Sequence, residues 1–214
     1  MKWMHALFAA LLGIVCATAQ ASAPDELIRP LQSRWAEIKY REPADRQADL
    51  YHALAQQARK LAEAHPNMPE VLIWEGIVLS SEAGARGGLG ALSLVKEARD
   101  RLDEAVQLND RALDGSAWTS LATLYAKVPG WPFGFGDETR AEEYFRKSLA
   151  INPAGIDPNF FYGEYLAEHG RTEEARGHLA AAVKAPPRPG RELADEGRRK
   201  EARALLEKLG KDAK

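Results

Sequence analysis

Apolar residues recur at spacings of three and four along most of this 214-residue chain, and most of these runs end at a helix breaker. Runs of alternating β-branched residues, which would predict strands, do not occur. The pattern predicts helices over residues 25–39, 44–64, 67–79, 91–108, 115–127, 137–151, 157–169, 171–185 and 191–209. We therefore expect an all-α fold.

Short polar motifs predict where several of these helices begin. Asn67-x-x-Glu70 has the spacing of a capping box. Asp137 is placed to cap the helix that follows it. Asp157-Pro158 has the preferred order of an N-cap residue followed by proline in the first turn. The four glycines between Ser80 and Gly90 predict a break between two helices.

Three stretches of the chain repeat one pattern of small and large apolar residues. The clearest copy consists of Trp118, Leu121, Ala122, Tyr125, Ala141, Phe145, Asn152 and Pro153. A second copy consists of Tyr162, Gly163, Leu166, Gly170, Ala175, Leu179, Ala182 and Pro187. A looser copy consists of Gly76, Leu79, Ala98, Leu102, Ala105 and Asn109. A helical hairpin of this kind cannot bury its apolar face alone, so neighbouring hairpins must stack.

These residues resemble the tetratricopeptide repeat (TPR) family. The resemblance implies a TPR-like α-solenoid of about three to four helical hairpins, wound as a right-handed superhelix around a concave groove. Repeats are expected at about 68–110, 115–153 and 157–187 within a domain over 22–214. The charged outer face predicted for residues 191–209 is typical of a capping helix at the end of a solenoid.

The repeats depart from the usual period of about 34 residues. The equivalent residues Ala105, Ser148 and Ala182 lie 43 and then 34 positions apart. We therefore expect inserted segments at Ser80–Gly90 and Val128–Gly136, which would map to one edge of the solenoid.

The second insertion and the Pro-rich link before the last helix narrow the resemblance. The insertion and the link resemble the corresponding segments of the periplasmic T component of TRAP-type transporters and, more distantly, of the regulator of microtubule dynamics proteins. This resemblance implies a scaffold, or a cradle for a ligand, without catalysis.

The N-terminus has the layout of a secretory signal peptide over residues 1–21. Lys2 precedes 11 apolar or small residues ending at Cys16, a run shorter than the about 20 residues that span a membrane. Cleavage is expected after Ala21, with Ala23 as the alternative site and an uncleaved anchor helix as the alternative structure. The expected mature protein has no cysteine and no stable membrane anchor, and it is periplasmic or secreted.

Aromatic residues in the second insertion are the leading candidates for a binding site. Trp131, Phe133 and Phe135 either pack on the solenoid as a lid or form an apolar lip that a ligand covers. Three residues of the flanking helices would line the same pocket: Tyr125, Phe161 and Tyr162. Their helical spacing is equally typical of repeat core.

The remaining motifs favour a protein that is not an enzyme. The chain has no G-x-S-x-G elbow, no HExxH motif and no Cys/His cluster, so we predict no catalytic residue, metal or cofactor. The glycines of Gly84–Gly90 lack the lysine and serine of a phosphate-binding loop. A formal net charge of −2 gives no indication of nucleic-acid binding.

The expected function is binding or adaptor activity, in which the concave groove holds a protein or peptide. The alternative is an accessory component of a periplasmic transport system that binds a small apolar ligand. The sequence does not predict the oligomeric state.

Overall fold

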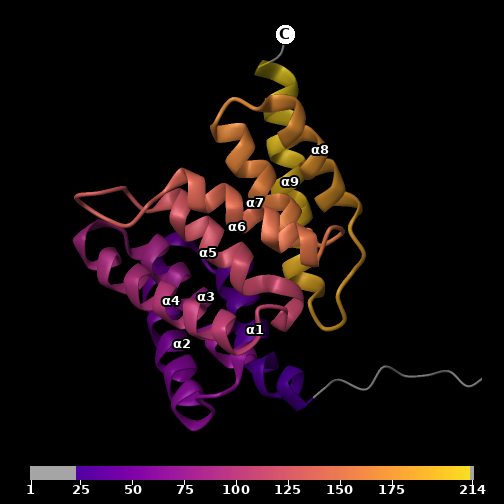
Figure 1. The fold of residues 1–214 in the computed structure, drawn as a ribbon. Coiled ribbons are helices and arrows are strands. Elements are labelled where there is room, and N and C mark those ends of the chain that lie inside the picture. Colours follow the sequence, from indigo (N-terminus) through magenta and orange to yellow (C-terminus); the bar gives the residue numbers. More distant parts are fainter. Residues whose placement is uncertain (1–22, 213–214) are drawn as a thin grey trace, which may run out of the picture.

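The computed structural model describes residues 23–212, and within them the chain is helical with no strand. Its α-helices are α1 (Ala23–Arg41), α2 (Ala44–Ala64), α3 (Pro69–Arg86), α4 (Gly88–Asn109), α5 (Ser116–Lys127), α6 (Glu138–Ile151), α7 (Ile156–Glu168), α8 (Thr172–Lys184) and α9 (Glu192–Asp212), with a short 3-10 helix η1 (Ala112–Gly115) before α5. The expected all-α class is confirmed, with more helices than the three clearest repeats account for. Figure 1 shows the helices following one another, with α9 beside α7 and α8.

Consecutive helices pair as α1/α2, α3/α4, α5/α6 and α7/α8. The small and large residues of the repeat pattern form the contacts within these pairs. A Cβ added to Gly76 would lie 2.7 Å from Leu102, and one added to Gly163 would lie 2.9 Å from Leu179. The second helices of the three pairs bury the equivalent residues almost completely: Ala98, Leu102, Ala105, Ala141, Phe145, Ser148, Ala175, Leu179 and Ala182. The repeated pattern therefore reflects close packing between the two helices of a pair.

The first helices of the pairs lie in a row. Helix α1 contacts α3, α3 contacts α5, and α5 contacts α7. Helix α9 contacts both α1 and α7, so it joins the two ends of this row. This arrangement positions the site described below.

The contact between α9 and α1 centres on a glycine. A Cβ added to Gly197 would lie 2.4 Å from the ring of Tyr40, so only glycine admits this approach. The Tyr40 hydroxyl donates a hydrogen bond of 3.3 Å to Glu201, and Lys39 lies 3.6 Å from the same carboxylate. The charged last helix is thus packed against the first one.

Two of the expected capping motifs are wrong. Helix α3 begins at Pro69 after Met68, and no side chain caps it, so the box of Asn67 and Glu70 does not form. Helix α7 begins one residue before Asp157, whose carboxylate pairs with arginines from later in the chain. The third motif is confirmed, because Asp137 accepts a hydrogen bond of 3.1 Å from the backbone of Arg140.

The insertion expected as a loop over Ser80–Gly90 is also wrong. Helix α3 continues to Arg86 and α4 begins at Gly88, so Gly87 alone connects them. Gly87 has φ 63°, a left-handed conformation that favours glycine and reverses the chain in one residue. The extra residues of this unit therefore lengthen its helices. The Val128–Gly136 insertion is a loop, as expected.

The expected signal peptide at residues 1–21 lies outside the described residues. Among the helices between residues 23 and 212, none is long and apolar enough to cross a membrane.

Candidate functional site: a closed concave chamber

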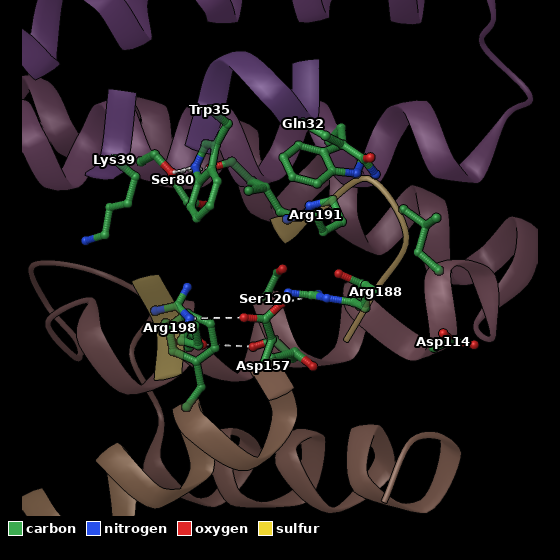
Figure 2. Close-up of a pocket in the computed structure, with 18 of the residues that line it drawn as sticks. Gln32, Trp35, Lys39, Ser80, Asp114, Ser120, Asp157, Arg188, Arg191 and Arg198 are labelled. Atoms are coloured by element: carbon green, nitrogen blue, oxygen red, sulfur yellow. Dashed lines mark hydrogen bonds and ion pairs between the residues drawn. The ribbon is translucent and has the colours of Figure 1, made fainter. Parts of the chain in front are cut away.

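The first helices of the pairs and the segment that follows α8 line a partly open cavity of about 1100 Å³, which we call the chamber. Its walls come from α1, α2, α3, α5 and α7, with η1 at one side, and it is covered by Arg188–Arg191 and α9. Figure 2 shows Trp35 and Lys39 of α1 on one side and Asp157 and Arg198 on the other. Helix α9 contacts both α1 and α7, so it lies across the cavity from one end of the row of first helices to the other.

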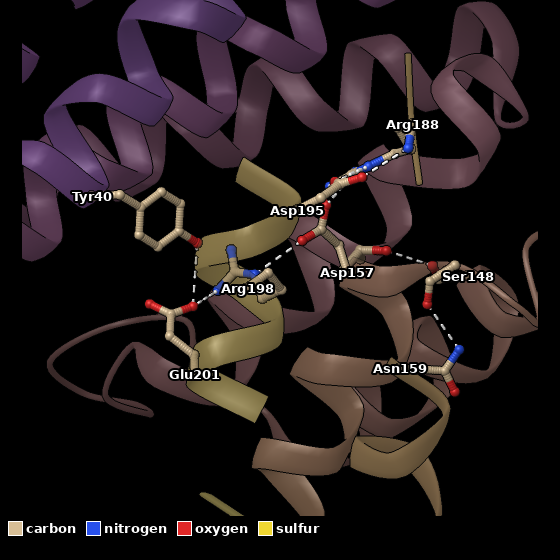
Figure 3. Close-up of polar contacts among 10 residues, drawn as sticks. Tyr40, Ser148, Asp157, Asn159, Arg188, Asp195, Arg198 and Glu201 are labelled. Atoms are coloured by element: carbon tan, nitrogen blue, oxygen red, sulfur yellow. Dashed lines mark hydrogen bonds and ion pairs between the residues drawn. The ribbon is translucent and has the colours of Figure 1, made fainter. Parts of the chain in front are cut away.

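The cover is held by a network of ion pairs around Asp157. Its carboxylate lies 2.7 Å from the Arg188 guanidinium and 3.0 Å from that of Arg198. Arg188 also pairs at 2.6 Å with Asp195, whose side chain is 1% exposed. Arg198 pairs at 2.7 Å with Glu201, which connects the network to Tyr40 of α1. Figure 3 shows this chain of contacts from the Arg188 linker to α1.

This network fixes the charge of Asp157. Burial alone would raise the pKa of the Asp157 carboxyl, but the guanidinium groups of Arg188, Arg198 and Arg191 hold it well below its usual range. The pKa of Arg188 is raised, because its two aspartate partners outweigh its burial. Asp157 is therefore an ionised structural partner at neutral pH and is not poised to exchange protons.

Aromatic rings line the chamber beside this network. Trp35 and Trp74 meet edge to face with their centroids 6.1 Å apart, and the Trp35 indole donates to Ser81 at 2.8 Å. Phe161 lies under Arg198, whose guanidinium carbon is 4.4 Å from the ring centroid. The Arg191 guanidinium carbon lies 4.9 Å from the centroid of Trp74. The chamber thus combines apolar walls with fixed positive charges.

The polar part of the wall comes from α5 and α3. Thr119, Ser120 and Thr123 face the chamber from α5, and Ser80 and Ser81 face it from α3. Thr119 bonds to Ser148, and the hydroxyl groups of Thr123, Ser80 and Ser81 donate to backbone carbonyls of their own helices. Their oxygen lone pairs are what they can offer a ligand.

The structure separates the six residues that the sequence predicts as a site. Phe161 lines the chamber. Tyr125 and Tyr162 are 6% and 5% exposed and belong to the core. Phe135 packs edge to face on Tyr125, with Arg99 over its ring at 4.7 Å.

The aromatic side chains at the tip of the 128–136 loop are exposed, unlike the four residues above. Trp131 and Phe133 are 90% and 76% exposed. Phe135 therefore packs on the helices, as expected for a lid, whereas Trp131 and Phe133 lie in solvent, as expected for an apolar lip.

Sequence reasoning missed most of the chamber. Asp157 has the local signal of an N-cap, and Trp35 fits the apolar stripe of a buried helix face. Arg191 and Arg198 fall in the predicted charged terminal helix, and Arg188 falls in the Pro-rich link before it. One usable signal was the run of Thr119, Ser120 and Thr123, which places hydroxyl groups on a helix that should face the groove.

Comparison of the chain with protein-family models and with curated protein sequences finds no match.

Proposed function

We propose that this protein is a non-enzymatic binding protein whose TPR-like solenoid holds a small ligand in the chamber. The single observation that carries the proposal is the cover: Arg188–Arg191 and α9 line the cavity between α1 and α7 and cover part of it. An extended peptide or a partner helix suits an uncovered groove, whereas a partly covered cavity of about 1100 Å³ has a volume close to that of small-molecule sites. The geometry thus favours the ligand-binding alternative over the adaptor.

Packing at the repeated positions supports the solenoid part of the proposal. The same glycine-to-leucine approach occurs in α3/α4 and in α7/α8, 87 residues apart in sequence between Gly76 and Gly163. The row formed by α1, α3, α5 and α7 supports a concave side built from first helices. The non-enzymatic part is supported by Asp157, which the arginines hold in its ionised form.

A periplasmic or secreted location remains part of the proposal and rests on the signal-like residues 1–21. A role as an accessory component of a transport system follows only if the ligand is a transported molecule.

Native mass spectrometry of the protein recovered from its own cells tests the proposal. We expect a bound small molecule in the wild type and its loss in Ser120→Trp, which places an indole inside the chamber. Ser93→Trp is the matched control, because Ser93 is exposed on α4. A bare protein mass together with a co-purifying protein partner would contradict the proposal.

One observation favours a second candidate, a protein-docking role for the loop. Trp131 and Phe133 are large apolar side chains held in solvent, an arrangement typical of binding surfaces. In that case Trp131→Ala with Phe133→Ala would abolish capture of a protein partner while leaving the bound small molecule in place.

A further inference from the structure

Arg191 stands apart from the other arginines of the chamber. Its guanidinium lies over the Trp74 ring, 4.9 Å from the centroid, at the start of α9. Within residues 23–212, no carboxylate lies within 4.0 Å of it, and its buried Nε has no hydrogen-bond partner. Figure 2 shows Arg191 lining the cavity between Gln32 and Arg188.

The neighbouring arginines Arg188 and Arg198, by contrast, each form two ion pairs. Arg188 pairs with Asp157 and Asp195, and Arg198 pairs with Asp157 and Glu201. The acids near the cover are thus already shared by other cations. Arg191 feels the charges of Asp157 and Asp195 from a distance but makes no direct ion pair with either.

The environment of Arg191 disfavours its charged form. Burial, followed by repulsion from Arg188, lowers the pKa of Arg191 to about 10. A guanidinium does not lose its proton at neutral pH, so the charge persists inside the chamber. A bound anion would remove this unfavourable state.

Two further hydrogen-bond donors of the chamber lack partners among the described residues. They are the indole Nε1 of Trp74, which is 3% exposed, and the hydroxyl of Tyr51, which is 2% exposed. Both side chains line the same cavity as Arg191. Buried donors without partners are rare in folded proteins. Both donor atoms are themselves buried, so a ligand in the cavity meets the two rings and not these donors.

The lining indicates the chemistry of such an anion. The guanidinium of Arg191 has no direct ion-pair partner among the described residues, and its planar fork fits the two oxygens of a carboxylate. Trp35, Trp74 and Ile77 offer apolar surface next to it. A phosphate monoester carries a second negative charge, and Arg29, the other arginine of the lining that forms no ion pair among the described residues, is exposed to solvent.

We propose that the chamber binds an organic carboxylate with an apolar or aromatic body. Arg191 contacts the carboxylate, and the rings of Trp35 and Trp74 contact the body. This inference rests on the proposed ligand-binding function and names the class of ligand.

Calorimetric titration with matched probes tests it. The probes are phenylpropionate and phenylvalerate, their neutral primary amides, and inorganic phosphate. We expect each carboxylate to bind at least about 10-fold more tightly than its amide, the ratio expected from one charge-assisted hydrogen bond. Phosphate is expected to bind more weakly than either carboxylate.

Variants assign this preference to Arg191. Arg191→Met removes the charge at similar length and should abolish the preference for the carboxylate, whereas Arg191→Lys should retain part of it. Arg203→Met is the matched control, because Arg203 is exposed on the same helix and should bind as the wild type does. The melting temperature of ligand-free Arg191→Met should be equal to or above that of the wild type, because an unpaired buried charge is removed.

Equal binding of amide and carboxylate would overturn the inference while leaving the proposed function intact. Retained preference in Arg191→Met, tighter binding of phosphate, or failure of both carboxylates to bind would also overturn it. A clear fall in the melting temperature of ligand-free Arg191→Met would show that Arg191 has a structural role. Failure of the proposed function is separate, because it would appear as a bare mass with a protein partner in the native spectra.

Discussion

Replacing Gly197 with alanine tests whether α9 closes the chamber against α1. Gly197 lies inside α9, where alanine is intrinsically more favourable than glycine by about 1 kcal/mol. Helix propensity alone therefore predicts a more stable protein. The structure predicts the opposite, because the new Cβ would lie 2.4 Å from a ring carbon of Tyr40.

The magnitude follows from what the Tyr40 ring contacts. Normal contact begins at 3.4 Å, so the ring or the helix must move by roughly 1 Å. The ring meets Trp35 edge to face at 6.1 Å, and its hydroxyl donates to Glu201, so movement disturbs both contacts. Overpacking of this kind costs about 1–3 kcal/mol, which leaves a net destabilisation of about 1 kcal/mol after the gain in propensity.

Gly177→Ala is the matched control for this substitution. Gly177 lies inside α8, and a Cβ there would have no atom within 4 Å, so only propensity acts. Urea unfolding followed by circular dichroism should show Gly177→Ala more stable than the wild type by about 1 kcal/mol. Equal stabilisation of the two variants would refute the closure of α9 on α1.

Four further substitutions test other parts of the structure. Asp157→Asn should lower the free energy of unfolding by about 2–4 kcal/mol, because it leaves two arginines without this shared partner. The pKa of Asp157 is lower in the folded protein than in the unfolded chain. The stability that its charge provides is therefore full above about pH 4 and is lost as the pH falls below that value. Urea unfolding midpoints measured against pH should show a smaller loss in acid for Asp157→Asn than for the wild type. Gly76→Ala and Gly163→Ala should each destabilise by about 1–3 kcal/mol in urea unfolding, because both glycines touch a leucine of the paired helix; unchanged stability would contradict the close packing. Trp131→Ala should change the thermal unfolding free energy by less than about 0.5 kcal/mol, since its ring is 90% exposed; a larger loss would mean that the loop tip packs on the helices.

The helices could be predicted well because their periodicity records local burial. Residues 44–64 were expected as one helix, and α2 has these bounds. Leu54 and Ala58, expected to face inward on it, are 1% and 0% exposed. Repeated small residues also predicted the pairs, since a glycine facing a leucine is needed in each close contact.

The glycine-rich segment misled the prediction for a physical reason. Glycine lowers helix propensity by only about 1 kcal/mol, and packing of the long α3 and α4 overrides that amount. Gly84 is therefore helical, while Gly87 alone makes the turn.

The chamber could not be predicted because its contacts join distant parts of the chain. Asp157 pairs with Arg188 and Arg198, which follow it by 31 and 41 residues. No local pattern distinguishes this pairing from an N-cap followed by a solvated helix. The approach of Gly197 to Tyr40 is equally invisible in sequence, although it decides whether the concave side is open.

Two-dimensional NMR of the tryptophan indole groups tests the central claim most directly, because these groups report separately on the chamber and on the loop. Trp35 and Trp74 line the chamber, Trp131 lies on the exposed loop, and Trp118 packs on Tyr144. Addition of phenylvalerate should shift the indole signals of Trp35 and Trp74 and leave those of Trp118 and Trp131 unchanged. A shift of the Trp131 signal with Trp35 and Trp74 unmoved would contradict the account and place binding on the loop.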